Sequence, residues 1–208
     1  MSKKIGFLVI FSAPSGCGKT TILTRLLKRH PEWVRSVSVT TRDPRLGEKA
    51  GKDYEFVSAS EFESLKKKDQ FLESAEVFGQ HYGTRKKRVE DAVRKGETIL
   101  LAVDVQGSRQ IRQVLGKATP FFSIFILPPS LSVLRERLEH RKTDSPGEID
   151  KRIRMAEDEI KAAREYDATV INHDLDQTVR EIEELLEGFE KKLEAEKTAK
   201  KSKSSKGD

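Results

Sequence analysis

A short stretch near the start of the chain has the residue types and order needed to hold a phosphate chain. An apolar run, residues 7–11, leads into a small-residue loop that ends in Gly18-Lys19-Thr20, just before a helical pattern. Backbone N–H groups of such a loop surround phosphate oxygens, and the next helix adds the positive end of its dipole. Lys19 can reach the terminal phosphates, and the Thr20 hydroxyl can bind Mg²⁺. We predict a nucleoside triphosphate site, because packing alone in a ligand-free turn hardly explains a Lys–Thr pair there.

The predicted loop has two unusual positions. Its members are Ala13, Pro14, Ser15, Gly16, Cys17, Gly18, Lys19, Thr20 and Thr21. Ala13 stands where the general pattern has glycine. Cys17 is the only cysteine, which excludes an intramolecular disulfide and a Cys-rich metal site. Its thiol is either a reactive group near a helix N-terminus, whose oxidation would block triphosphate binding, or a small residue that fits.

Arginines elsewhere in the chain could hold further phosphates. Arg42 and Arg45 lie three positions apart in a segment that Pro44 and Gly47 mark as a loop. The planar guanidinium matches phosphate oxygens bidentately, although two solvated surface arginines are the simpler alternative. Arg137 and Arg141 share a helix face by their spacing.

The elements that must position these residues alternate between strand and helix. Nearly continuous apolar runs predict buried strands at 5–12, 98–103, 121–127 and 168–171, and shorter strands are expected at 34–39 and 55–57. Helices are predicted at 20–29, 59–68, 85–95, 107–115, 131–140, 149–165 and 175–189, and a turn at 79–84. The alternation predicts an α/β fold, a three-layer α/β/α arrangement around a mainly parallel sheet. Asp104 follows a strand at the edge where such sheets place ligand chemistry.

Composition narrows the classes of function. The 208 residues carry a net charge of +6, but residues 191–208 hold seven Lys and three acidic residues and so account for +4 of it. Residues 1–190 therefore lack the strong positive charge that is typical of a nucleic-acid-binding surface. The short apolar run after the first four residues is too short for a signal sequence or a membrane span, so we expect a soluble cytoplasmic protein. The Lys/Ser-rich tail 191–208 is expected to be disordered.

The order of the motifs favours a small-molecule kinase over other triphosphate-binding proteins. A GTPase would be expected to carry an Asn/Thr-Lys-x-Asp segment, and the sequence has none. A kinase needs an acceptor site, a cationic centre for the transferred phosphoryl group, and a lid that excludes water. Candidate residues for all three occur along the chain.

Several motifs resemble those of guanylate kinases, members of the P-loop nucleoside monophosphate kinases. The longest is the run 36–57, SVSVTTRDPRLGEKAGKDYEFV. Others are Tyr82-Gly83-Thr84, Asp104-Val105-Gln106-Gly107, the spacing of Arg137, Arg141 and Arg152, and the run 170–175, VINHDL. They follow the family's order from about residue 6 to 189. Ala102 is a departure, because the family usually has an acidic residue there.

The resemblance implies a fold, a reaction and a division of the chain. The domain would be 1–190, with a core of 1–36, 89–131 and 158–190, a GMP-binding subdomain of 37–88 and a lid of 132–157. The reaction would transfer the γ-phosphate of ATP to GMP, or to dGMP, with Mg²⁺, giving ADP and GDP in purine nucleotide metabolism. The chain could be a monomer or a homodimer.

The resemblance also implies roles for individual residues. Arg42, Arg45, Tyr54 and Tyr82 would bind the GMP phosphate, and Ser38 and Glu73 would read guanine beside Gly83 and Thr84. Lys19, Arg137, Arg141 and Arg152 would act on the ATP phosphates, and Asn172 would lie near adenine. Asp104 would either organise Mg²⁺ through water, together with Thr20, or belong to the guanine site.

The chemistry of guanine supports the role of Glu73 independently. Guanine presents N1–H and N2–H₂ as paired donors, and a carboxylate accepts both, whereas adenine would leave the carboxylate unpaired. Such mispairing discriminates by about 10⁴-fold. Two other functions stay open: a non-catalytic module that binds phosphorylated peptides at the Arg/Tyr site, and a kinase for another nucleoside monophosphate. The first would be expected to lack Lys19 or the lid arginines, which this chain has.

Overall fold

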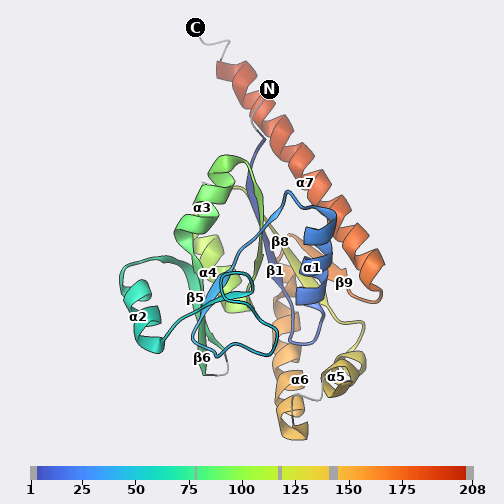
Figure 1. Ribbon diagram of the computed structural model, residues 1–208. Helices are drawn as coiled ribbons and strands as arrows, with labels where there is room; N and C mark the ends of the chain where they lie inside the picture. Colours follow the sequence, from blue (N-terminus) through green and yellow to red (C-terminus); the bar gives the residue numbers. More distant parts are fainter. Residues whose placement is uncertain (1–3, 78, 117–118, 141–144, 205–208) are drawn as a thin grey trace.

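A five-stranded parallel sheet forms the centre of the molecule (Figure 1). The computed structural model describes residues 4–77, 79–116, 119–140 and 145–204. The strand order is β2-β7-β1-β8-β9. The strands are β1 (Phe7–Ser12), β2 (Val34–Arg35), β7 (Thr98–Ala102), β8 (Phe121–Leu127) and β9 (Ala168–Ile171). All neighbouring pairs are parallel, as the apolar runs predicted.

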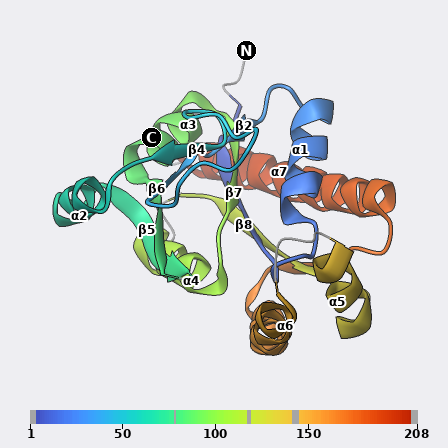
Figure 2. The same cartoon turned by 60° about the horizontal axis from the view of Figure 1, so that its bottom comes forward.

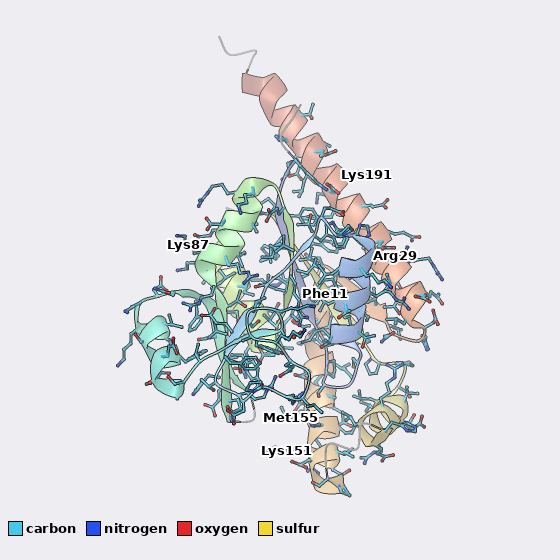
Figure 3. The ribbon with its side chains drawn as sticks, in the orientation of Figure 1. Phe11, Arg29, Lys87, Lys151, Met155 and Lys191 are labelled. Atoms are coloured by element: carbon cyan, nitrogen blue, oxygen red, sulfur yellow. The ribbon has the colours of Figure 1, made fainter. Side chains whose placement is uncertain are left out.

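Helices cover both faces of this sheet (Figure 2). α1 (Lys19–Arg29) and α7 (Leu175–Ser204) lie on one face, and α3 (Lys86–Lys95) and α4 (Val105–Leu115) lie on the other. The alternation of β1 explains the two layers: Val9 and Phe11 belong to the first core, Leu8 and Ile10 to the second. Phe11 is labelled in the interior in Figure 3. The predicted three-layer α/β/α fold is confirmed.

A smaller four-stranded sheet stands beside the core. Its order is β4-β3-β6-β5, and only β3 and β4 are parallel. The strands are β3 (Ser38–Thr40), β4 (Tyr54–Phe56), β5 (Phe71–Val77) and β6 (Gln80–Arg85), and α2 (Ala59–Lys67) packs against them. The turn expected over 79–84 is wrong beyond Gly79, which has φ 73°. His81, Tyr82 and Thr84 favour strand, and pairing with β5 outweighs the glycine at 83.

Two further helices lie at one end of the main sheet, α5 (Leu131–His140) and α6 (Pro146–Lys161), and α6 continues into a 3₁₀ turn, Ala162–Glu165. Helix α6 begins earlier than the predicted 149. Ser145 and Glu148 form a capping box and Pro146 occupies the first turn, which fixes the helix start. Residues 141–144 lie outside the described chain, so the prediction for Arg141 cannot be placed.

The expectation of a disordered tail is wrong for residues 191–204. Helix α7 runs without a break from Leu175 to Ser204, and its last turns project beyond the body in Figure 1. Leu193 still packs against the core, and the segment beyond it is rich in Lys, Glu and Ala, which are good helix formers, and has no proline. Residues 205–208 lie outside the described chain.

Candidate active site

The predicted phosphate-binding loop, residues 13–18, connects β1 to α1 and is held by a hydrogen bond from Asn172. Gly16 and Gly18 have φ values of 99° and 85°, which explains the glycines. The Asn172 Nδ2 donates to the Cys17 carbonyl at 2.9 Å, and a Cβ at Gly18 would lie 2.7 Å from that nitrogen. The amide of Asn172 therefore holds the loop. Cys17 is fully buried in the core, which favours a small residue that fits over a reactive thiol.

Lys19 begins α1, and its ammonium group lies near oxygen atoms of the β7–α4 connection and of α6. Its Nζ donates to the Val103 carbonyl at 3.0 Å, beyond the end of β7. Burial lowers the pKa of Lys19, while the nearby carboxylates of Glu159 and Asp104 act in the opposite direction. Glu159, from α6, has its pKa raised to about 7, mainly by burial, against the influence of Lys19. Nothing in the sequence distinguishes Glu159 from the other acidic residues of this charged helix.

Asp104 lies at the carboxyl end of the sheet, as predicted, and has a structural role that the sequence did not indicate. It is the N-cap of α4, and its Oδ1 accepts a hydrogen bond from Gly107 N at 2.7 Å. Asp104 also interacts electrostatically with both Lys19 and Glu73. It therefore stands between the phosphate-binding loop and the small sheet.

One face of the small sheet gathers the predicted acceptor-binding residues. Tyr54 pairs with Ser38, and Glu73 pairs with Thr84. Because Val39 pairs with Gly83, Ser38 stands opposite Thr84, so these four residues form one row across the sheet. Tyr82 lies two positions from Thr84 on the same strand and so on the same face.

The opposite face of the small sheet is a core. Val39, Phe62 and Phe71 pack there, and a Cβ at Gly83 would lie 2.9 Å from the Phe71 ring. Residues two positions apart on a strand normally lie on the same face of the sheet. The register shift between Phe71 and Glu73 breaks this rule and places their side chains on opposite faces. The bulge thus buries Phe71 and turns Glu73 toward the face that carries Ser38 and Thr84.

Glu73 is the buried carboxylate of this face, with 5% of its surface exposed. Its Oε1 accepts a hydrogen bond from the Thr84 hydroxyl at 2.6 Å. Burial raises the pKa of Glu73 to about 7, and Asp104 adds to the increase while the Thr84 hydrogen bonds oppose it. A Cβ at Gly107 would lie 2.8 Å from Glu73 Oε2, so the carboxylate lies directly over the first turn of α4.

Arg42 is held by a carboxylate that the sequence analysis did not single out. Its Nη2 donates to Glu48 Oε1 and Oε2 at 2.9 and 3.0 Å, and its Nη1 to the Asp43 carbonyl at 2.6 Å. Glu48 Oε2 also accepts from Arg45 N at 2.8 Å, which closes the loop. Burial is the largest influence on both groups: it favours a higher pKa for Glu48 and a lower pKa for Arg42. The hydrogen bond between the two side chains, with their attraction, acts in the opposite direction, so the pKa of Glu48 is lowered and the pKa of Arg42 is raised.

Aromatic rings complete the surroundings of Arg42. The guanidinium carbon lies 5.2 Å from the centre of the Tyr54 ring, and Arg42 also interacts electrostatically with Tyr82. The Tyr54 and Tyr82 rings meet edge to face at 6.1 Å. The sequence predicted this grouping of Arg42 with both tyrosines.

A cavity of about 230 Å³ separates this group from helix α6. Its lining residues are Arg42, Arg45, Val77, Gln80, Tyr82, Glu148, Lys151 and Arg152. Lys151 is labelled on α6 in Figure 3. Arg152 Nη1 donates to the Ser15 hydroxyl in the phosphate-binding loop at 2.7 Å. Arg152 therefore touches the loop while lining the cavity beside Arg42.

Comparisons with known proteins agree with this geometry. The family model described as guanylate kinase matches residues 6–189. The chain belongs to the guanylate kinase family. It is 44% identical over 181 residues to a guanylate kinase of Synechocystis sp., covering 87% of this chain and 93% of that protein. It is also 44% identical to a guanylate kinase of Vibrio parahaemolyticus, over 95% of this chain and 94% of the other.

A solved structure shows the same fold. The crystal structure of guanylate kinase from Anaplasma phagocytophilum superposes with a TM-score of 0.73 at 36% identity, covering 89% of this chain and 87% of that one. The resemblance drawn from the motifs is confirmed, and with it the prediction of a phosphotransferase that uses ATP. In the described part of the chain, no helix has the length and apolar character to cross a membrane.

Arg137, on α5, also lies near the loop, through its contact with Asn172. Arg137 Nη2 donates to the Asn172 carbonyl at 2.9 Å, and Asn172 braces the loop through Cys17. Arg137 and Arg152 thus approach the loop from different helices. Of the predicted ATP-side arginines, only Arg141 lies outside the described residues.

Proposed function

We propose that Glu73, Arg42 and Lys19 are the residues through which this chain catalyses the reaction of its family, in which ATP and GMP give ADP and GDP. The observation that supports the assignment most directly is the buried Glu73 carboxylate. It lies in one row with Ser38 and Thr84, on the face of the small sheet that also carries Tyr54 and Tyr82. A buried carboxylate has few water molecules to bind, so it needs a partner that donates hydrogen bonds to it. The donor edge of guanine is such a partner.

The acceptor phosphate would lie in the cavity lined by Arg42, Arg45 and Tyr82. Arg42 and Arg45 would cancel its charge, which otherwise repels the triphosphate. The Tyr54 ring lies against the Arg42 guanidinium, and Tyr82 lines the same cavity. The contacts proposed here read the base and the phosphate, and none reads the 2′-hydroxyl. We therefore expect dGMP to be accepted as well as GMP.

The triphosphate would lie on the loop 13–21, with Lys19 and the α5 and α6 arginines on its phosphates. Arg152 touches both the loop and the acceptor cavity, so it stands where the phosphoryl group would pass between nucleotides. A nucleotide phosphate is already an anionic nucleophile and needs no general base. Positioning and charge stabilisation then provide most of the rate.

The donor set near the loop fits a Mg²⁺ ion. The Thr20 hydroxyl and the Asp104 carboxylate are hard oxygen donors, the kind that Mg²⁺ prefers. Among the described residues no group of three His, Cys, Asp or Glu could hold a metal, which agrees with an ion bound chiefly by phosphates and water. When bound, Mg²⁺ would neutralise charge on the phosphates. Thr20 would ligate the ion, and Asp104 would act through water.

The rival functions make different predictions from the same site. A phosphopeptide-binding module would use Arg42, Arg45 and Tyr82 but would not need Lys19, and a kinase for another monophosphate would not need Glu73. Lys19 and Glu73 are both present, and both interact electrostatically with Asp104. This arrangement favours guanylate kinase chemistry. The cytoplasmic location and the oligomeric state stay predictions.

The role of Glu73 is tested by Glu73→Gln. The NH₂ group of glutamine would replace one acceptor oxygen and would face an N–H group of guanine, so one hydrogen bond is lost and two donors oppose each other. We expect KM for GMP to rise by about 100-fold, with KM for ATP unchanged. Glu76→Gln is the matched control, because Glu76 is exposed on the same strand. Unaltered KM for GMP in folded Glu73→Gln would contradict the assignment.

A further inference from the structure

At one residue of its outer edge, Ser74, the small sheet is paired by a side chain instead of a strand. β5 is the last strand of that sheet, and its outer edge faces α4. On α4, Gln110 Nε2 donates to the Ser74 carbonyl at 2.9 Å, and Gln110 Oε1 accepts from Ser74 N at 3.0 Å. One carboxamide therefore satisfies both backbone groups of Ser74.

This pairing reproduces what a neighbouring strand would do. A carboxamide carries an N–H donor and a C=O acceptor together, as a peptide group does, and only Asn and Gln side chains offer both. An edge strand otherwise leaves such groups to water. Gln110 is partly buried, so each of its two bonds replaces a bond to water in a sheltered place.

The residue whose backbone is held in this way directly follows Glu73. Helix α4 also touches the Glu73 carboxylate itself, because Gly107, one turn before Gln110, leaves just enough space for Oε2. Asp104 caps the same turn. One helix thus locates Glu73 twice: Gln110 fixes its backbone, and the first turn of α4 limits where its carboxylate can lie.

We propose that Gln110 is a positioning residue for guanine recognition, holding the strand of Glu73 on helix α4 so that the carboxylate meets the base. This inference rests on the role proposed above for Glu73. Gln110 does not touch the nucleotide and acts through Ser74 and Glu73. It also ties the small sheet to the core at the point where the base is read.

The test is Gln110→Leu, which removes both hydrogen bonds and keeps much of the volume. We expect KM for GMP to rise by about tenfold, the factor that the net loss of buried hydrogen bonds implies, with KM for ATP unchanged. Gln113→Leu is the matched control on the exposed side of the same helix. A folded Gln110→Leu protein with unaltered KM for GMP would overturn the proposal.

A double-mutant cycle separates positioning from general stability. If Gln110 acts through Glu73, Gln110→Leu should add little to KM for GMP in a Glu73→Gln background. Equal effects in both backgrounds would show that Gln110 does not act through Glu73 and would overturn the proposal. If Glu73→Gln alone leaves KM for GMP unchanged, the assignment of Glu73 fails first, so the two failures are distinguishable.

Should Gln110→Leu not fold, Gln110→Glu takes its place. It keeps the chain length and the oxygen that accepts from Ser74 N, and it loses the donor to the Ser74 carbonyl. One carboxylate oxygen would then face the Ser74 carbonyl oxygen without a proton between them, so we expect an increase in KM for GMP at least as large as that of Gln110→Leu, again with KM for ATP unchanged. An unchanged KM for GMP in this variant would equally overturn the proposal.

Discussion

At the scale of single residues, the site depends on one carboxylate that the fold keeps away from water. Glu73 is reached by Thr84 on one oxygen and lies against Gly107 with the other. Its pKa of about 7 is the consequence of that burial, and the same burial makes its choice of partner strict. Small changes around Glu73 should therefore appear as changes in GMP affinity before they appear as loss of the fold.

Gly107→Ala is such a change. The added Cβ would lie 2.8 Å from Glu73 Oε2 and 3.2 Å from Asp104 Oδ1, so the Glu73 carboxylate must move. Alanine is otherwise better than glycine in a helix, so the fold should be kept. We expect KM for GMP to rise by about tenfold. Gly188→Ala, where an added Cβ would meet nothing outside its own helix backbone within 4 Å, is the control, and equal kinetics in both variants would refute this account.

The raised pKa of Glu73 also predicts a pH dependence. Guanine binding needs the ionised carboxylate, and the pKa is about 7 in the free protein. Lowering the pH from 8 to 6 protonates Glu73, so KM for GMP should rise by about tenfold. Glu73→Gln corrects for titration of the GMP phosphate, because it lacks the carboxyl group. If wild type and Glu73→Gln show parallel pH profiles of KM for GMP, the predicted titration does not occur.

At the scale of elements, the proposed transfer step depends on how α6 meets the loop after β1. The prediction concerns Arg152, which bonds to Ser15 and lines the cavity beside Arg42. Arg152→Ala should lower kcat by about 100-fold while KM for GMP changes much less, because charge on the transferred group is then less stabilised. Arg154→Ala, exposed on the same helix, is the control in the steady-state assay. A rise in KM for GMP with kcat intact would place Arg152 in acceptor binding instead.

The elements also show what a sequence can and cannot predict. The strands 121–127 and 168–171 lie where the apolar runs put them. For 121–127 the run is long because β8 lies inside the sheet and is covered on both faces. Strand β6 and the end of α7 were missed, because their polar sequences carry no periodic signal and are ordered by pairing or by helix propensity.

The same limit applies to the site. Lys19, Arg42 and Tyr82 could be named from motifs, because their chemistry is local to the loop or strand that bears them. Glu48 lies in such a motif but shows its role only in its bond to Arg42. Glu159 and Gln110 act across elements distant in sequence, and only packing brings them to Lys19 and Ser74.

At the scale of the whole molecule, each of the two sheets carries one of the two proposed nucleotide sites. The parallel sheet presents the phosphate-binding loop, and the small sheet presents the row from Tyr54 to Glu73. Asp104 and α4 lie between them, at the carboxyl edge of the parallel sheet where open α/β proteins bind ligands. This arrangement accounts for a chain that binds a triphosphate on one side and a guanine monophosphate on the other.

The most direct test of this account measures ADP release by the wild-type chain with ATP, Mg²⁺ and one nucleoside monophosphate at a time. The account predicts fast turnover with GMP, turnover with dGMP, and kcat/KM for AMP, CMP and UMP lower by about 10⁴-fold, because these bases leave Glu73 wrongly paired. Turnover that favours another base, or no turnover with GMP, would contradict it.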